Sequence, residues 1–117
     1  MARLPYVSMT LKNPAHPAKS ARIRFFVDSG TPISVAPGQV LTKIGLRPSG
    51  TQKFDLVDGS EIERPVGQAV FVYRGQERVS PIIFGEEGDS TVLGKATLAS
   101  FGLALNPLRG ELVKLPA

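Results

Sequence analysis

Glycine and proline divide this sequence into short segments, and this is the feature that most constrains its fold. Twelve glycines and ten prolines are spread over 117 residues. The segments between them are rich in Val, Ile, Phe and Leu. Turn residues at this spacing around such segments are typical of an all-β protein. With 42% hydrophobic and 21% charged residues, the chain has the composition of one ordinary globular domain, so we expect residues 1–117 to form a single all-β domain.

The expected secondary structure is mostly strand. Strands are predicted over residues 6–11, 21–28, 33–36, 52–57, 60–64, 67–73, 77–84, 90–93 and 111–114. Short helices are predicted over 38–44 and 95–101, each followed by a glycine suited to a helix C-terminus. The two helical segments resemble each other, which either reflects two related halves or arises by chance.

Turns and loops are predicted from local chemistry. The pairs Asp58-Gly59 and Arg74-Gly75 suit two-residue turns, which predicts hairpins over 52–64 and 67–84. Residues 13–20 contain two prolines, which have no backbone N–H for a β-ladder. We therefore expect a loop there, with His16 in it.

The inventory of reactive side chains excludes several classes of chemistry. Cysteine is absent and His16 is the sole histidine. This excludes thiol catalysis, disulfides and Cys/His zinc sites, and it leaves a Ser-His-Asp triad only if His16 is the base. Acid-base chemistry must then come mainly from carboxylates.

Charge and hydropathy identify no special partner. Fourteen Lys and Arg against ten Asp and Glu give a net charge of +4, and the basic residues are scattered without a run. No apolar run approaches the roughly 18 residues of a membrane span, and the N-terminus does not resemble a secretory signal. We expect no nucleic acid and no membrane as partner, and a cytoplasmic location by default.

Asp28 is the acid in an unexpected place. The other nine acids fall in predicted turns, hairpins or loops or, for Glu111, at the start of a terminal strand, where a solvated charge is the default. Asp28 ends an apolar run in which Phe25 and Val27 would point to one face and Phe26 and Asp28 to the other. A carboxylate in apolar surroundings is costly unless it is hydrogen-bonded or shares its charge, so Asp28 is a candidate functional residue. The alternative is a plain Asx turn that closes a strand, for which Asp-Ser-Gly is a common composition.

Residues 25–31, Phe-Phe-Val-Asp-Ser-Gly-Thr, resemble the active-site motif of the retropepsin-like aspartic proteases. That motif is two apolar residues, Asp, Thr or Ser, Gly and a small residue. Val92-Leu93-Gly94 and residues 95–103 resemble the family's apolar-apolar-Gly step and its C-terminal helix, and Asp58-Gly59 falls where the family has its flap. The resemblance covers about residues 10–113 and implies a retropepsin-like closed barrel, a single lobe with one or two short helices. Pro32 and Pro37 depart from the common pattern.

The resemblance also implies an activity. A single-lobe chain supplies one aspartate, so two copies of Asp28 would meet in a homodimer, one activating a water and the other polarising the scissile carbonyl of a peptide or protein substrate. No metal or cofactor is needed. The implied site consists of Asp28 as the catalytic residue, Ser29, Gly30 and Thr31 in the active-site loop, Leu56, Val57, Asp58, Gly59 and Ser60 in the flap, and Leu93 and Gly94 as structural residues near the site.

Finer expectations follow from the same resemblance. Ser29 should hydrogen-bond across the dimer interface, and the Thr31 hydroxyl should lie near the outer oxygen of Asp28. The terminal strands, residues 6–11 and 111–114, are candidates for a dimer sheet. Four aliphatic residues are candidates for either substrate pockets or core: Ile33, Val35, Ile82 and Ile83.

Three other readings stay open. The first is a non-catalytic peptide- or protein-binding module with the retropepsin fold. The second is a basic β-barrel that binds nucleic acid, suggested by the excess of Lys and Arg in residues 1–53, although stacking aromatics are few. The third is a serine hydrolase, which would need His16 and for which no Gly-x-Ser-x-Gly motif is present.

Overall fold

The computed structural model describes residues 5–106 and 108–115. Strands dominate, as expected from the spacing of turns. The elements, in chain order, are β1 (Tyr6–Asn13), β2 (His16–Val27), β3 (Ser34–Pro37), α1 (Gly38–Lys43), β4 (Gly50–Asp55), β5 (Glu61–Tyr73), β6 (Gln76–Gly85), β7 (Val92–Leu93), α2 (Lys95–Phe101), β8 (Leu103–Asn106) and β9 (Glu111–Lys114).

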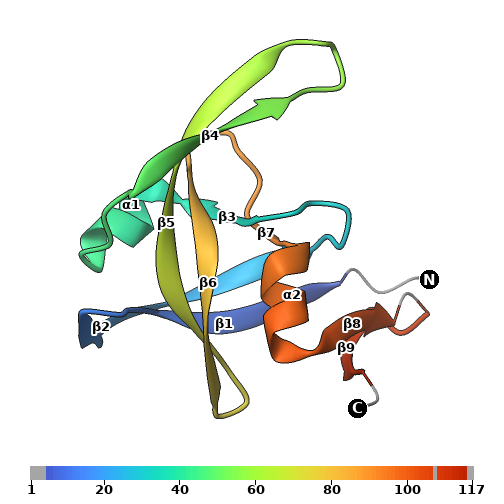
Figure 1. Cartoon of the computed structure of the whole chain (residues 1–117). Helices are drawn as coiled ribbons and strands as arrows, with labels where there is room; N and C mark the ends of the chain where they lie inside the picture. The colour runs from blue at the N-terminus through green and yellow to red at the C-terminus, as the bar shows by residue number, and fades with distance from the viewer. Residues whose placement is uncertain (1–4, 107, 116–117) are drawn as a thin grey trace.

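Seven strands form one sheet in the order β1-β2-β7-β3-β6-β5-β4. Strand β1 also pairs with β5, so six of the seven strands are joined in a continuous ring of pairings. Strands β8 and β9 form a separate two-stranded sheet next to α2 (Figure 1). The all-β architecture with two short helices is the one predicted from the sequence.

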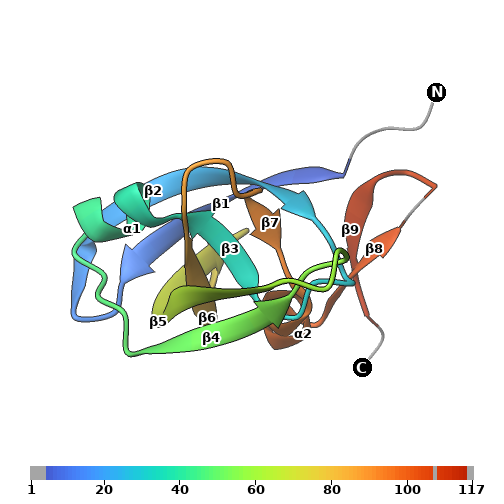
Figure 2. The ribbon, with the colours of Figure 1, turned by 90° about the horizontal axis from the view of Figure 1, so that it is seen from above.

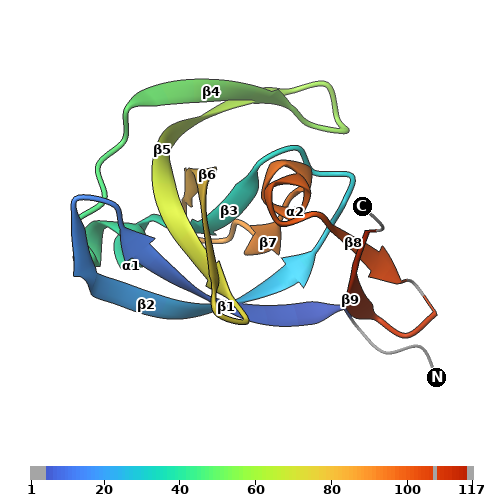
Figure 3. The same cartoon turned by 60° about the horizontal axis from the view of Figure 1, so that its bottom comes forward.

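The β4–β5 hairpin projects from this ring. Strand β5 is long enough to pair with β4 over its first half and with β6 over its second half. The tip of the hairpin and the loop that follows β2 lie on the same side of the molecule: they overlap when seen from above, and Figure 1 shows the tip standing clear of the loop (Figures 1, 2 and 3). This arrangement brings two segments far apart in the sequence to one side of the molecule.

The core lies inside the ring of strands. Phe25 and Phe71 are buried with their rings 6.0 Å apart, and Leu41 of α1 and Leu98 of α2 are buried in the same cluster. Burial alternates along β2: Phe25 and Val27 are buried, whereas Phe26 and Asp28 are only partly so. The alternation confirms that Phe26 and Asp28 share the face opposite the core.

The predicted loop over residues 13–20 is wrong. β1 continues to Asn13 and β2 begins at His16, so the connection is a tight turn. The register places Lys12 opposite Ser20 and Asn13 opposite His16, which leaves the three intervening residues of β2 as a bulge. Pro17 lies in this bulge, where the missing backbone N–H breaks no ladder bond. His16 is exposed.

Two further predictions need correction. The strands predicted over 60–64 and 67–73 are one strand, β5, which begins at Glu61 and continues through Pro65, close to the point where its pairing partner changes from β4 to β6. Strand β8 was not expected, and it pairs with β9. Both helices lie where they were predicted. In the described part of the chain, no helix is long and apolar enough to cross a membrane.

The two predicted two-residue turns differ. Arg74 and Gly75 form such a turn between β5 and β6, with φ values of 49° and 79°. The turn at Asp58-Gly59 is longer, because the Leu56 N–H donates to the Ser60 carbonyl and the Gly59 N–H donates to the Leu56 carbonyl. With Gly59 at φ 87°, this is a three-residue loop that closes on a glycine bulge.

Candidate active site

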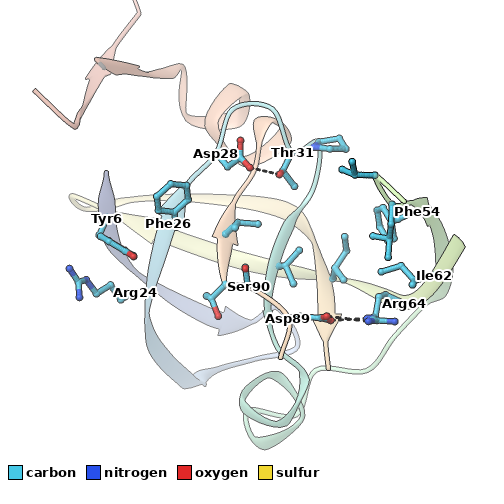
Figure 4. Close-up of a pocket in the computed structure, with 17 residues that line it drawn as sticks. Tyr6, Arg24, Phe26, Asp28, Thr31, Phe54, Ile62, Arg64, Asp89 and Ser90 are labelled. Carbon is cyan, nitrogen blue, oxygen red and sulfur yellow. Dashed lines mark hydrogen bonds and ion pairs between the residues drawn. The ribbon is translucent and has the colours of Figure 1, made fainter. Parts of the chain in front are cut away.

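A cleft of about 1050 Å³ lies between the β4–β5 hairpin and the end of β2. Its walls are mostly apolar, with few charged groups. The lining residues are Tyr6, Arg24, Phe26, Asp28, Thr31, Pro32, Val35, Phe54, Leu56, Val57, Ile62, Arg64, Ile83, Asp89, Ser90, Thr91 and Val92. Figure 4 shows Asp28 and Thr31 at one edge, with Arg24 and Arg64 on opposite sides.

Asp28 lies directly after β2, with its carboxylate bonded on both oxygens. The Gly30 N–H donates to Oδ1 at 2.9 Å, and the Thr31 hydroxyl donates to Oδ2 at 2.8 Å. The second contact is the one expected for Thr31. Donors on both oxygens stabilise a negative charge and fix the orientation of the carboxylate. Asp28 is half-buried, so its remaining acceptor positions are available to a partner group or a water.

The backbone of the loop after Asp28 is braced by segments far along the chain. The Asp28 N–H donates to the Leu93 carbonyl of β7 at 3.0 Å. At the start of α2, the N–H groups of Lys95 and Ala96 donate to the carbonyls of Thr31 and Pro32 at 2.7 and 2.9 Å. The first turn of a helix has N–H groups without an internal partner, and here the loop satisfies two of them. The loop is therefore fixed from β7 on one side and from α2 on the other.

Gly94 makes this close packing possible. A Cβ atom at this position would lie 2.7 Å from the Ile33 carbonyl carbon and 2.8 Å from the Thr31 carbonyl oxygen. Both neighbours are backbone atoms, so no side chain could move aside. Leu93 and Gly94 therefore lie beside the Asp28 loop, and glycine has a steric role at position 94.

Three buried hydroxyl groups support the same region. The Thr97 hydroxyl lies 2.7 Å from that of Ser34 and 2.9 Å from that of Ser80. The Ser34 hydroxyl also accepts a hydrogen bond from the Gly94 N–H at 2.8 Å. The network joins β3, β6 and α2 beneath the loop, and every hydroxyl in it has a partner, as buried polar groups require.

The tip of the β4–β5 hairpin contributes to the cleft only in part. Leu56 and Val57 line it, whereas the predicted flap residues Asp58, Gly59 and Ser60 do not. The Ser60 side chain and backbone N–H both donate to Asp58 Oδ1, and these bonds hold the pKa of Asp58 below its ordinary value. Leu56 and Val57 are exposed, which leaves apolar surface on the side of the tip that faces the cleft.

The other predicted site residues are distributed as follows. Val35 and Ile83 line the cleft, whereas Ile82 is in the core and Ile33 is not among the lining residues. Ser29 is exposed and does not line the cleft of a single chain. Among the described residues, no cluster of His, Asp or Glu is arranged to hold a metal ion.

One charged pair in the cleft was missed by sequence analysis. Arg64 of β5 donates two hydrogen bonds, of 2.8 and 3.1 Å, to Asp89 of the β6–β7 loop. The Arg64 guanidinium also lies 3.6 Å from the Glu86 carboxylate. The hydrogen bonds from Arg64 lower the pKa of Asp89. Asp89 was expected to be a solvated loop residue, and nothing in its local sequence indicates a partner 25 positions away.

Solved structures with a similar fold include three proteases. The protease of EIAV, solved with an inhibitor, has a TM-score of 0.67 at 15% identity, covering 89% of this chain and 93% of its own. A retropepsin-like aspartic protease from Rickettsia conorii has a TM-score of 0.55 at 17% identity, over 86% and 75%. The simian foamy virus protease has a TM-score of 0.53 at 17% identity, over 80% and 92%.

The chain has the retropepsin-like fold. Comparisons with models of protein families and with curated protein sequences give no match. The likeness in fold agrees with the one expected from residues 25–31 and 92–103, and it extends over most of the chain. At this level of identity it concerns the fold, so the chemistry must be argued from the residues of the cleft.

Proposed function

We propose that this protein is an aspartic endopeptidase that acts as a homodimer. The observation that carries the proposal is the Asp28 carboxylate, which lies at the edge of a mostly apolar cleft and is held by two donors. The retropepsin-like fold supports the same conclusion. A peptide chain in extended form fits a cleft of this kind between a sheet and a hairpin.

The number of carboxylates in the cleft argues for two copies of the chain. Among the described residues, Asp28 and Asp89 are the acids that line the cleft. Asp89 is bonded through both oxygens to Arg64, which leaves Asp28 as the carboxylate open to chemistry. Hydrolysis by paired aspartates needs a second carboxylate in contact with the first. The simplest source is Asp28 of a second copy, related by a twofold axis.

In the proposed mechanism, two neighbouring Asp28 carboxyl groups share one proton because both cannot easily be ionised. The ionised group takes a proton from a water, and the water oxygen bonds to the scissile carbonyl carbon. The protonated group donates a hydrogen bond to the carbonyl oxygen. The tetrahedral intermediate then collapses and the C–N bond breaks. The leaving nitrogen takes the proton that the first carboxylate received from the water. Thr31 would orient the carboxylate in each copy.

The β4–β5 hairpin is the proposed flap. Leu56 and Val57 would cover an extended substrate, and the apolar lining by Val35, Ile83 and Val92 would favour apolar side chains beside the scissile bond. The second candidate function is a peptide-binding module that does not cleave. It is favoured because, among the described residues that line the cleft of one chain, Asp28 is the one carboxylate not bonded to an arginine, and one carboxylate cannot supply a dyad.

The test is cleavage of a mixed peptide library between pH 3 and 8, with the solution mass of each protein recorded. We expect the wild-type dimer to cleave, Asp28→Asn to be a dimer without activity, and the control Glu87→Gln, which also replaces a carboxylate by an amide, to cleave like wild type. Glu87 is exposed in the loop between β6 and β7 and does not line the cleft. Equal activity in Asp28→Asn would overturn the proposal. A dimeric but inert wild type would favour the binding module.

A further inference from the structure

The two arginines that line the cleft differ in their partners. Arg64 is bonded to Asp89 and its side chain is largely covered. Arg24 on β2 is exposed, and within residues 5–106 and 108–115 its guanidinium has no hydrogen bond or ion pair with an acid. On one side of the cleft the charge of Arg64 is therefore balanced by Asp89, whereas on the other side the charge of Arg24 has no acidic partner among the described residues. Figure 4 shows the two arginines on opposite sides of the cleft.

Arg24 is held by aromatic rings rather than by carboxylates. Its guanidinium carbon lies 4.2 Å from the centroid of the Tyr6 ring. The Tyr6 ring in turn packs edge to face against Phe26, with centroids 5.5 Å apart. Stacking engages the flat face of a guanidinium and leaves its N–H donors, which lie in the plane, free to bind an acceptor. The rings thus position the cation without neutralising it.

The register of β2 relates Arg24 to the candidate catalytic residue. Arg24, Phe26 and Asp28 lie at every second position, so their side chains are on the same face of the strand. All three line the cleft. Four residues of extended chain span roughly 13 Å. A substrate that reaches from Asp28 to Arg24 would therefore place a side chain near the guanidinium about three or four residues from the scissile bond.

We propose that Arg24 is a specificity-determining residue that selects peptides with an acidic side chain about three or four residues from the scissile bond. The inference rests on the proposed function, because that function defines where the scissile bond lies. In a twofold dimer each copy supplies one Arg24, so acids on either side of the scissile bond would be recognised. A carboxylate can accept two parallel N–H donors from one guanidinium, which favours Glu or Asp over Gln or Asn.

The same strand offers a matched control. Arg22 is also exposed on β2, on the same face as Arg24, but it does not line the cleft. Arg22→Gln and Arg24→Gln lower the net charge equally. A general attraction of the basic protein for acidic peptides would be affected by both variants, whereas a specific contact would be affected only by Arg24→Gln.

The experiment compares cleavage of paired peptides that differ only by Glu or Gln at each position up to four residues from a scissile bond. We expect wild type and Arg22→Gln to prefer Glu over Gln by roughly tenfold in kcat/KM at a position three or four residues from the scissile bond, on either side of it, as for a hydrogen-bonded charge. Arg24→Gln should lose this preference and keep its rate on the Gln peptide. Absence of a preference in wild type, or its survival in Arg24→Gln, would overturn the inference while leaving the protease function standing.

Two further measurements separate the remaining outcomes. The solution mass of Arg24→Gln should equal that of wild type, and a loss of the dimer would overturn the inference by placing Arg24 in the subunit interface. If no peptide is cleaved, binding of the same pairs is measured by fluorescence anisotropy. A preference for Glu that depends on Arg24 would then support an acidic ligand although the protease proposal fails. Absence of this preference would overturn both the protease proposal and the inference about Arg24.

Discussion

The Asp28 loop and the tip of the β4–β5 hairpin face the same cleft, but they are held in different ways. The loop bonds through its backbone to Leu93 and Lys95, far along the chain. Within the described part of the chain, the hydrogen bonds of the tip run only among Leu56, Asp58, Gly59 and Ser60. Segments held only by local bonds open at low free energy, whereas segments tied to the core open with it. The part proposed to do chemistry is thus fixed, and the part proposed to cover substrate is free to move.

The largest effect on stability is expected where the fixed region is most tightly packed. Gly94→Ala places a Cβ against backbone atoms of Thr31 and Ile33 and should lower the free energy of unfolding by about 3 kcal/mol. Urea denaturation followed by circular dichroism measures it. Gly50→Ala is the control, since a Cβ at Gly50 meets no atom within 4 Å. Equal stability of the two variants would show that the loop is not held as described.

An intermediate effect is expected at the base of the hairpin, where Arg64 binds Asp89. Because Arg64 lowers the pKa of folded Asp89, the pair stabilises the fold above the pKa of the unfolded chain, near 4, and this contribution is lost as the pH falls through the folded pKa. Wild type should therefore be more stable than Asp89→Asn at pH 6, and the difference should shrink below about pH 4.

Thermal unfolding across pH 3 to 7 measures this difference. Arg64→Gln should remove the same pH-dependent contribution, because it deletes the other member of the pair. A stability difference that does not change with pH would show that the pair does not anchor the base of the hairpin.

The smallest effect on stability is expected at the tip. Val57 is fully exposed, so Val57→Ser should change the free energy of unfolding by less than about 0.5 kcal/mol. If the tip covers substrate, the same variant should raise KM several-fold with little change in kcat, because it removes binding made equally in the ground and transition states. Val79→Ser, exposed on β6 and outside the cleft, should leave both parameters unchanged. An unchanged KM in Val57→Ser would separate the tip from substrate binding.

The sequence predicted the parts of the site that depend on local pattern. Residues 25–31 indicated both the strand and the acid that follows it, and the positions of both helices were confirmed. Alternation along β2 correctly placed Phe26 and Asp28 on one face, because side-chain direction in a strand follows residue parity. The contact between the Thr31 hydroxyl and Asp28 was expected from the resemblance to the retropepsin-like motif, and the structure contains it.

The features that escaped prediction depend on tertiary neighbours. The Arg64–Asp89 pair joins two elements that are not adjacent in sequence. Pro17 was assigned to a loop, and the strands predicted on either side of Pro65 were kept separate. Pro17 instead lies in a bulge and Pro65 near a change of pairing partner, where a missing N–H costs little. Strand β8 is short and half-buried, and only its pairing with β9 identifies it.

Two copies of Asp28 are proposed to act together, and mixing wild type with Asp28→Asn is the sharpest test of this cooperation. The two proteins are combined at constant total concentration, allowed to exchange subunits, and assayed for peptide cleavage. If each active site needs one Asp28 from each chain, an equal mixture should retain about a quarter of the wild-type activity, because only wild-type pairs are active. Retention of about half, in proportion to the wild-type chains present, would show that each chain acts alone and would contradict the account.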